Sequence, residues 1–260
     1  MPEPAPALLL IAHGTRVPEG AQEMDRLLGE LRERHAGQLA HGWLEDFAEP
    51  GTVAAATDLA ARGAERVVVV PFLNFAAYHA RTDIPGQVRQ ARDALPAVRF
   101  AMGRVLGHHP ALLDLAERRV RDARTAAGLA GEPGPGELLV VAASGSSDAE
   151  SNSDVAKAAR LLAERTGHRW AEPAFAGVTW PTAEEALARG HRAGARSAVV
   201  FSWSLLAGLL ERKVGDQARA VATATGLTLI DAGRFGPDPL VADAVMDRFH
   251  EAATAAFPWD

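Results

Sequence analysis

Short apolar runs alternate with longer amphipathic segments along the chain. Leu8 to Ala12 is the first apolar run, and the segment that begins at Pro18 carries apolar residues at the three- and four-residue spacing of one helix face. Val67 to Val70 form a continuous apolar run, which is typical of a parallel strand covered by helices on both faces. This alternation predicts repeated β-α-β units.

The same pattern predicts the other elements of the first half. They are strands around Trp43 to Phe47, at Arg66 to Phe72 and near Val98 to Met102, an alanine-rich helix that ends at Gly63, and a helix that begins at Pro110. The segment from Gly128 to Gly136 is rich in glycine and proline, which exclude both a helix and a central strand. We therefore expect a linker near the middle of the chain.

Segments of the first half recur after this linker at an offset of about 130 residues, which indicates an internal duplication. The matching pairs are Leu8 to Ile11 with Leu138 to Val141, Arg62 to Val70 with Ala193 to Phe201, and Leu106 to Pro110 with Phe235 to Pro239. We expect an N-terminal lobe at 1–127, a linker at 128–137 and a degenerate repeat lobe at 138–260. The predicted fold is α/β, with two similar lobes that are each a parallel sheet flanked by helices. A cleft between the lobes is expected at the carboxyl ends of the strands.

Composition limits the function. The chain has 260 residues, of which 48% are hydrophobic, so it can bury a large core. No apolar run approaches the about 18 to 20 residues of a membrane span, and the opening Met1 to Pro4 lacks the basic start of a secretory signal. We expect a cytoplasmic protein that uses no membrane. The net charge of −6 argues against nucleic acid as a partner.

The chain contains no cysteine, so a metal ion must be held by histidine and carboxylate side chains. His13 directly follows the first strand, and His79 ends the loop that follows the third. Neutral imidazole suits iron, cobalt, nickel and zinc ions. Either histidine alone would more often satisfy a local hydrogen bond, but their placement at neighbouring strand ends predicts a metal-binding pair.

The second repeat lacks this pair. Ser144 stands in place of His13, and Leu209 or Leu210 stands in place of His79. The duplication therefore predicts one active lobe and one supporting lobe.

Several segments together resemble the sirohydrochlorin chelatases of the CbiX type. They are Leu8 to Arg16, Leu44 to Pro50, Val67 to Phe72 with the loop to His79 and Pro85, and Leu106 to Pro110. The resemblance covers nearly the whole chain and fits the long form, in which both lobes lie in one chain and the second has lost the histidines. It implies a chelatase-like fold, with His13 and His79 binding the incoming metal. Tyr78 stands where this family commonly has glycine.

The resemblance implies an ATP-independent metal chelatase, a lyase that inserts a divalent metal into sirohydrochlorin. A phosphate-binding loop ending in Gly-Lys-Ser/Thr is absent from the sequence. Fe²⁺ insertion, which gives sirohaem, is weakly preferred, and Co²⁺ insertion for cobalamin biosynthesis is the alternative. The metal is a substrate, and we expect no permanently bound cofactor. We expect the chain to act on its small-molecule tetrapyrrole as a monomer with two fused lobes.

Metal insertion releases two pyrrolic protons, so the site needs a base as well as a weak metal ligand. We expect His13, His79 and Glu45 to be catalytic, with Glu45 as the proton relay and Glu49 as the alternative carboxylate near the substrate. Either glutamate could instead be a solvated residue or an acid at a helix start. Arg16 and Arg81 flank the histidines, and their guanidinium groups suit the carboxylates of the tetrapyrrole.

Other functions and sites were weighed against this one. A metal or tetrapyrrole carrier that binds without catalysis would differ by the absence of turnover. A serine nucleophile at Ser144 or Ser146 lacks the Gly-x-Ser-x-Gly elbow, and the same segment suits a turn before a helix that starts at Ser153 or Asp154. His108 and His109 suit a helix start. The remaining histidines are expected at the surface: His35, His41, His168, His191 and His250.

Overall fold

The first repeat forms a four-stranded parallel sheet in the order β2-β1-β3-β4. The computed structural model describes residues 5–45 and 48–255. The strands are β1 (Ala7–Ala12), β2 (Leu39–Trp43), β3 (Arg66–Phe72) and β4 (Arg99–Met102). The connecting helices are α1 (Pro18–Arg34), α2 (Thr52–Ala61), the π-helix η1 (His79–Asp83) that leads into α3 (Ile84–Ala94), and α4 (Pro110–Ala126).

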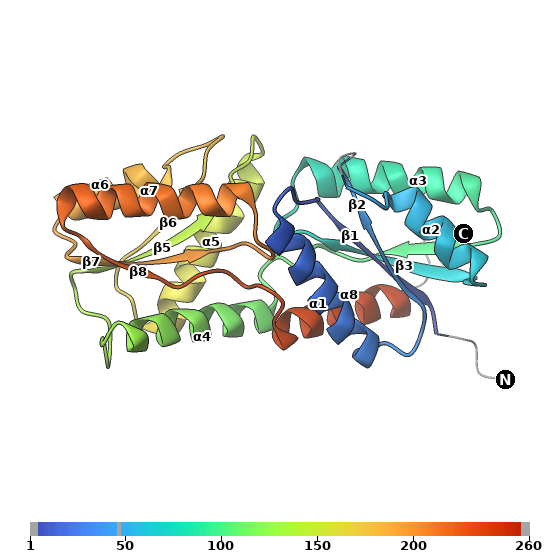
Figure 1. Ribbon diagram of the computed structural model, residues 1–260, viewed down its shortest axis with the longest axis horizontal. Coiled ribbons are helices and arrows are strands. Elements are labelled where there is room, and N and C mark those ends of the chain that lie inside the picture. Colours follow the sequence, from blue (N-terminus) through green and yellow to red (C-terminus); the bar gives the residue numbers. More distant parts are fainter. Residues whose placement is uncertain (1–4, 46–47, 256–260) are drawn as a thin grey trace. The chain divides into compact units, whose positions relative to one another are not determined.

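The second repeat forms a sheet of the same topology, in the order β6-β5-β7-β8. Its strands are β5 (Glu137–Ala143), β6 (Ala171–Phe175), β7 (Ser197–Ser202) and β8 (Thr228–Asp231). Its helices are α5 (Ala149–Thr166), α6 (Ala183–Arg192), α7 (Leu209–Thr225) and α8 (Pro239–Thr254). The predicted α/β fold with two parallel sheets flanked by helices is confirmed (Figure 1).

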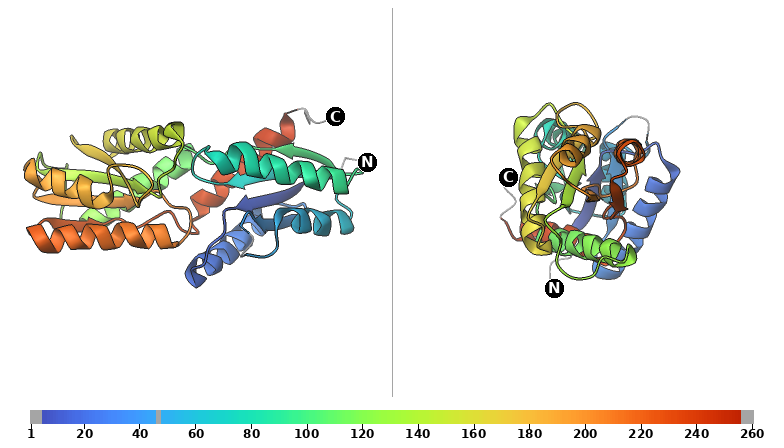
Figure 2. Two further views of the ribbon diagram at one scale, coloured as in Figure 1. Left: turned by 90° about the horizontal axis from the view of Figure 1, so that it is seen from above. Right: turned by 90° about the vertical axis from the view of Figure 1, so that its left-hand side faces the viewer.

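Helices cover both faces of each sheet, which explains the continuous apolar strands (Figure 2). Every residue of β1 is buried. Leu9 and Ile11 face a core formed with α2 and α3, while α1 and α8 pack against each other on the opposite face, where α8 contacts β3. In the second sheet, Leu138 and Val140 pack against α6 and α7.

The chain packs into two compact units that differ from the predicted lobes. Unit 1 comprises Met1–Gly107 and Pro237–Asp260, and unit 2 comprises His108–Gly236. Helix α4 therefore belongs to the unit of the second sheet, where it contacts α5, β7 and β8. Helix α8 belongs to the unit of the first sheet. Residues 128–136 form neither helix nor strand, as their glycine and proline content predicts.

Two predicted boundaries were wrong. β2 ends at Trp43, where the prediction had it begin. This edge strand is half-buried and contains His41 and Gly42, so it lacks a clear apolar pattern; Asp46 and Phe47 of the predicted strand lie outside the described residues. Helix α5 starts at Ala149 rather than near Ser153, because Asp148 caps it.

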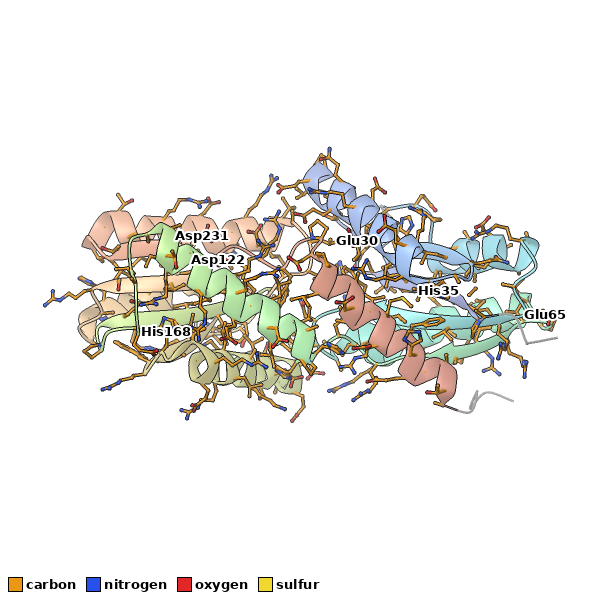
Figure 3. The ribbon with its side chains drawn as sticks, turned by 90° about the horizontal axis from the view of Figure 1, so that it is seen from below. Glu30, His35, Glu65, Asp122, His168 and Asp231 are labelled. Carbon is orange, nitrogen blue, oxygen red and sulfur yellow. The ribbon has the colours of Figure 1, made fainter. Side chains whose placement is uncertain are left out.

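The prediction of surface positions was wrong for two histidines. His35 and His168 are buried, with 7% and 6% of their surface exposed; Figure 3 shows both side chains within their units. The His35 ring packs against Phe249, at a centroid distance of 4.7 Å. A lone histidine in sequence carries no sign of such a tertiary contact.

Among the helices in the described residues, none combines the length and apolarity that a membrane crossing would require.

Candidate metal centre

His13 and Glu45 are held together by the loop that follows β2. β1 ends at Ala12, and His13 is the next residue. The N–H groups of Leu44 and Glu45 donate to the carbonyls of Ala12 and His13 at 2.9 and 3.2 Å, which continues the parallel pairing past the strand ends. The side chains consequently meet, with His13 Nε2 3.4 Å from Glu45 Oε1.

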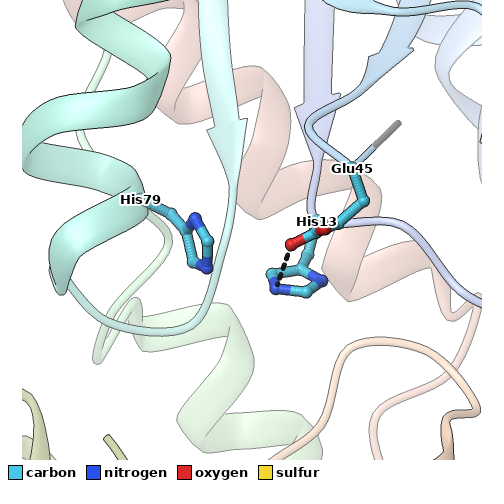
Figure 4. Close-up of side chains that lie close together, drawn as sticks. All are labelled: His13, Glu45 and His79. Atoms are coloured by element: carbon cyan, nitrogen blue, oxygen red, sulfur yellow. Dashed lines mark ion pairs between the residues drawn. The ribbon is translucent and has the colours of Figure 1, made fainter. Parts of the chain in front are cut away.

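His79 reaches the same place from the loop after β3. It is the first residue of the π-helix η1. Insertions of a π turn are frequent at functional sites. The rings of His13 and His79 lie edge to face, with centroids 4.7 Å apart and planes at 87° (Figure 4).

His13, Glu45 and His79 each offer a ligand atom, and these atoms all lie within 4.8 Å of one another. Two nitrogen ligands on one ion are at most about 4.2 Å apart, since each bond is about 2.1 Å long. Small side-chain rotations would therefore bring the three residues into chelating distance. Two imidazoles and a carboxylate leave coordination positions open, which suits an ion that must leave again.

Asp83 selects the tautomer of a neutral His79. It was not predicted as a site residue. Its Oδ2 lies 2.7 Å from His79 Nδ1. A carboxylate only accepts hydrogen bonds, so Nδ1 carries the proton and donates, and Nε2 keeps its lone pair for a metal. The four-residue spacing of His79 and Asp83 was a usable signal in the sequence, because residues so spaced share a helix face.

The surroundings of His13 favour its neutral form. The pKa of His13 is lowered, first because partial burial desolvates the imidazolium and second because His79 lies beside it; Glu45 and the backbone of Gly14 act in the opposite direction. A neutral imidazole is the form that binds a metal ion.

The predicted substrate-binding residues Arg16, Arg81 and Glu49 are not members of the group of His13, Glu45 and His79. Arg16 and Arg81 are exposed, in the turn after His13 and in η1 respectively. Glu49 is exposed, and its Oε2 accepts the N–H of Gly51 at 3.1 Å, at the start of α2. Glu49 is thus an acid at a helix start. Phe72 and Phe75 are buried, whereas Tyr78 is exposed.

The backbone of unit 2 repeats the frame of this site without its side chains. The N–H of Ala176 donates to Ala143 as that of Leu44 donates to Ala12, so Ser144 and Gly177 take the positions of His13 and Glu45. The bond from Phe235 to Ser204 repeats that from Leu106 to Leu73. Counting onward in both repeats places Leu210 at the position of His79.

The other candidate residues have structural roles. Ser146 Oγ accepts the N–H of Asp148 at 3.0 Å, which is a turn at the start of α5. His109 Nδ1 accepts the N–H of Ala111 at 3.3 Å and caps α4, so the prediction of a helix start is confirmed. His108 Nε2 lies 2.8 Å from the carbonyl of Asp154.

A duplicated α/β fold with two histidines and a carboxylate at the strand ends of one repeat defines a metal-handling protein. Its repeats match the CbiX family model over residues 7–123 and 138–252, and the chain belongs to that family. It is thus a long-form, CbiX-type chain with both repeats fused.

Known proteins resemble it along most of its length. The sirohydrochlorin cobaltochelatase of Priestia megaterium is 28% identical over 94% of this chain and 79% of its own. The sirohydrochlorin ferrochelatase of Bacillus subtilis (strain 168) is 24% identical over 95% of this chain and 92% of its own. The structure of SirB from Bacillus subtilis with Fe³⁺ superposes with a TM-score of 0.83 at 24% identity, over 98% of this chain and 99% of that one. This likeness supports the fold.

Proposed function

We propose that this protein is an ATP-independent sirohydrochlorin chelatase, which inserts a divalent metal ion into the tetrapyrrole. The observation that carries the proposal is the group of His13, Glu45 and His79 within a chain of the CbiX family. The reaction exchanges two pyrrolic protons for one M²⁺. The reaction therefore requires ligands that bind the ion and then release it, and a base that takes up the protons.

In the proposed reaction, His13 and His79 hold the ion through neutral ring nitrogens. Asp83 keeps Nε2 of His79 available, as its hydrogen bond to Nδ1 requires. Glu45, beside His13, accepts a proton as the ion passes to the ring. Arg16 and Arg81 pair with peripheral carboxylates of the tetrapyrrole, and Glu49 lies near the same substrate.

Fe²⁺ is the proposed physiological metal, and the product is then sirohaem. Co²⁺ is the second candidate, favoured by the similarity to a sirohydrochlorin cobaltochelatase. Imidazole affinity rises from iron to cobalt, so ligand chemistry alone would favour cobalt and cellular supply decides. We further propose that the protein acts as a monomer, because both repeats that form the fold lie in one chain. We also propose that it acts in the cytoplasm.

Turnover tests the proposal. Purified protein is mixed with sirohydrochlorin and Fe²⁺ under anaerobic conditions, or with Co²⁺, and ring absorbance is followed. Metallated product should exceed the protein in molar amount. A product that stops at one equivalent would instead indicate a carrier.

His13→Ala and His79→Ala should each lower the rate at least about 100-fold, because each removes a metal ligand that also accepts protons. His250, an exposed histidine of α8, provides a matched control. His250→Ala should retain the wild-type rate. Near-normal turnover in either His13→Ala or His79→Ala, with the fold verified by circular dichroism, would refute the assigned ligands.

A further inference from the structure

One peptide group in the loop after β2 is bonded to both segments that carry the histidines. It is the peptide between Leu44 and Glu45. Its N–H, which belongs to Glu45, donates to the carbonyl of His13 at 3.2 Å. Its carbonyl, which belongs to Leu44, accepts a hydrogen bond from Nε2 of Gln87 at 3.4 Å. The peptide is therefore held on one side by the end of β1 and on the other by α3, the helix that continues from His79.

Gln87 lies on the helix that begins at His79. The chain is helical without a break from η1 into α3, because Asp83 and Ile84 at their junction both have right-handed helical backbone angles. His79, Asp83 and Gln87 follow one another at intervals of four residues, so they lie along one side of this helix. The side that bears the histidine therefore also bears the amide that reaches the loop of Glu45.

Apolar packing brings α3 and this loop together at the same place. The side chain of Leu44 belongs to one buried cluster with Ile84 and Val88, which lie on either side of Gln87 in the sequence. The loop thus contacts α3 through an apolar side chain and through a carbonyl that accepts a hydrogen bond. Of the two contacts, only the hydrogen bond has a preferred direction, so it determines the orientation of the peptide.

The second repeat contains the same hydrogen bond. Gln217 of α7 donates through Nε2 to the carbonyl of Ala176 at 3.3 Å. Ala176 is the equivalent of Leu44, because its N–H donates to Ala143 as that of Leu44 donates to Ala12. The residue that follows is a glutamate in the first repeat and a glycine in the second. Gln217 therefore shows what this hydrogen bond contributes where no carboxylate depends on it.

Glu45 requires such support because its side chain is only partly covered. The exposed fraction of the side chain is 35% for Glu45 and 49% for His13, and Oε1 of Glu45 lies 3.4 Å from Nε2 of His13. Packing alone therefore leaves both side chains room to rotate. Ligands of a metal site must be held within about 0.5 Å of their working positions. A rotation of the peptide before Glu45 would move its whole side chain.

We propose that Gln87 is a positioning residue of the candidate metal centre, and that its hydrogen bond to the Leu44 carbonyl orients the peptide that places Glu45 beside the two histidines. The inference rests on the proposed function and adds a residue to it. Gln87 is not itself a ligand and acts through Glu45. All of these residues belong to unit 1.

A double-mutant cycle on Co²⁺ binding, followed by the visible absorption of the ion, tests this role. Gln87→Met keeps the length of the side chain but removes the donor. It should weaken Co²⁺ binding about tenfold, as expected for the loss of a group that orients a ligand. In a Glu45→Ala background, Gln87→Met should have no further effect, because two changes that remove the same interaction are not additive.

Two results of this cycle would overturn the inference. Unchanged Co²⁺ affinity in Gln87→Met would show that the hydrogen bond does not position a ligand. Additive losses in the double variant would show that Gln87 does not act through Glu45. The absorption spectrum of bound Co²⁺ gives a second measurement, since Gln87→Met should shift it in the same direction as Glu45→Ala. Gln87→Leu replaces Gln87→Met if circular dichroism shows that the methionine variant does not fold.

Gln217→Met is the matched control, because it removes the same hydrogen bond from the unit that lacks the candidate ligands. Gln87→Met and Gln217→Met should lower the free energy of unfolding in urea by similar amounts. Gln217→Met should nevertheless bind Co²⁺ as the wild type does. Equal losses of Co²⁺ affinity in the two variants would show that the hydrogen bond serves only the fold, and would overturn the inference.

The proposed function and the positioning role fail differently. If the protein shows the expected cycle in Co²⁺ binding but never metallates sirohydrochlorin, the chelatase is refuted and the positioning role is supported. If it metallates the ring and Gln87→Met binds Co²⁺ as the wild type does, the chelatase is supported and the positioning role is refuted. A wild-type protein with no affinity for Co²⁺ or Fe²⁺ would refute the proposed ligands together with the residue that positions them.

Discussion

Asp83 determines which nitrogen of His79 is free. Its carboxylate accepts a hydrogen bond from Nδ1 at 2.7 Å and thereby leaves the lone pair of Nε2 available for the proposed metal ion. This selection of the Nδ1–H tautomer requires a group at position 83 that only accepts a hydrogen bond, as a carboxylate does. A neutral amide at the same position can present either its oxygen or its NH₂ group to the ring.

Asp83→Asn should therefore weaken Co²⁺ binding about 10- to 100-fold, the usual cost of losing the carboxylate partner of a metal-binding histidine. The measurement is a titration followed by Co²⁺ absorption. Asp83→Glu, which restores a carboxylate, should recover part of the affinity. If Asp83→Asn and wild type bind Co²⁺ equally well, Asp83 has no role in positioning His79.

The lowered pKa of His13 predicts the position of an acid limb. An ordinary histidine titrates near about 6.5, and desolvation and His79 shift the pKa of His13 downward. Loss of metal binding through protonation of His13 should therefore occur below that pH. Because Glu45 raises the pKa of His13, Glu45→Gln should move this limb to still lower pH.

The check is the fraction of protein that has bound Co²⁺, measured against pH at two metal concentrations. The midpoint should fall as metal concentration rises, since the ion and the proton compete for the same nitrogen. A limb that is independent of metal concentration, or that Glu45→Gln moves to higher pH, would contradict this role of His13.

At the scale of elements, Asp148 rather than a serine controls the turn after β5. Its Oδ1 accepts the N–H groups of Glu150 and Ser151 at 2.9 and 3.2 Å, which caps α5. Asp148→Ala should lower the free energy of unfolding by about 1 kcal/mol, whereas Asp148→Asn should retain most of it. Urea unfolding measures both.

The same turn tests the serine alternative. Ser144 is exposed and stands where His13 stands in unit 1. Ser144→Ala should keep the wild-type rate of metal insertion. A loss comparable with that of His13→Ala would show that unit 2 contributes to catalysis.

Elements with a strong apolar pattern could be predicted from the sequence. β3 has the predicted bounds, because a strand buried on both faces must be apolar throughout. β2 could not be placed, because an edge strand with one half-exposed face tolerates histidine and glycine. The start of α5 was ambiguous since several residues near Asp148 can cap a helix, and tertiary packing selects among them.

The site could be predicted in part for a related reason. Parallel strands end at one edge, so His13 and His79 could be expected together before any coordinates. The contact of His79 with Asp83 was not predicted, although their four-residue spacing was a signal for it, because no local propensity indicates the π-helix that contains both residues. The assignment of Leu210 as the equivalent of His79 in the second repeat likewise required the repeated backbone hydrogen bonds.

At the scale of the whole molecule, a buried polar cluster makes stability depend on pH. His168 lies 3.0 Å from Glu137 through Nε2 and 2.7 Å from Thr166 through Nδ1, while Arg124 Nε lies 2.6 Å from Glu137. These residues come from α4, β5, the end of α5 and the loop that follows it. The pKa of His168 is lowered because burial desolvates the ring, although Glu137 acts in the opposite direction.

The sign follows from the lowered pKa. Below about pH 6.5 the imidazole of His168 is protonated in the unfolded chain, whereas in the folded protein its lowered pKa keeps it neutral to lower pH. The free energy of unfolding should therefore fall as pH drops from there through the folded pKa of His168, by at most about 1.4 kcal/mol per pH unit. His168→Gln should reduce this slope in urea unfolding series. An identical slope in wild type and variant would contradict the prediction.

Helix α8 ends the second repeat in sequence yet belongs to unit 1, where it packs against α1 and β3. Unit 2 is continuous in sequence, whereas unit 1 is assembled from two separated stretches. On the ribosome, unit 2 can therefore complete its fold as soon as residue 236 has emerged, but the unit that bears the histidines must wait for α8. The fold of the unit that carries the candidate metal centre would thus be completed after that of unit 2.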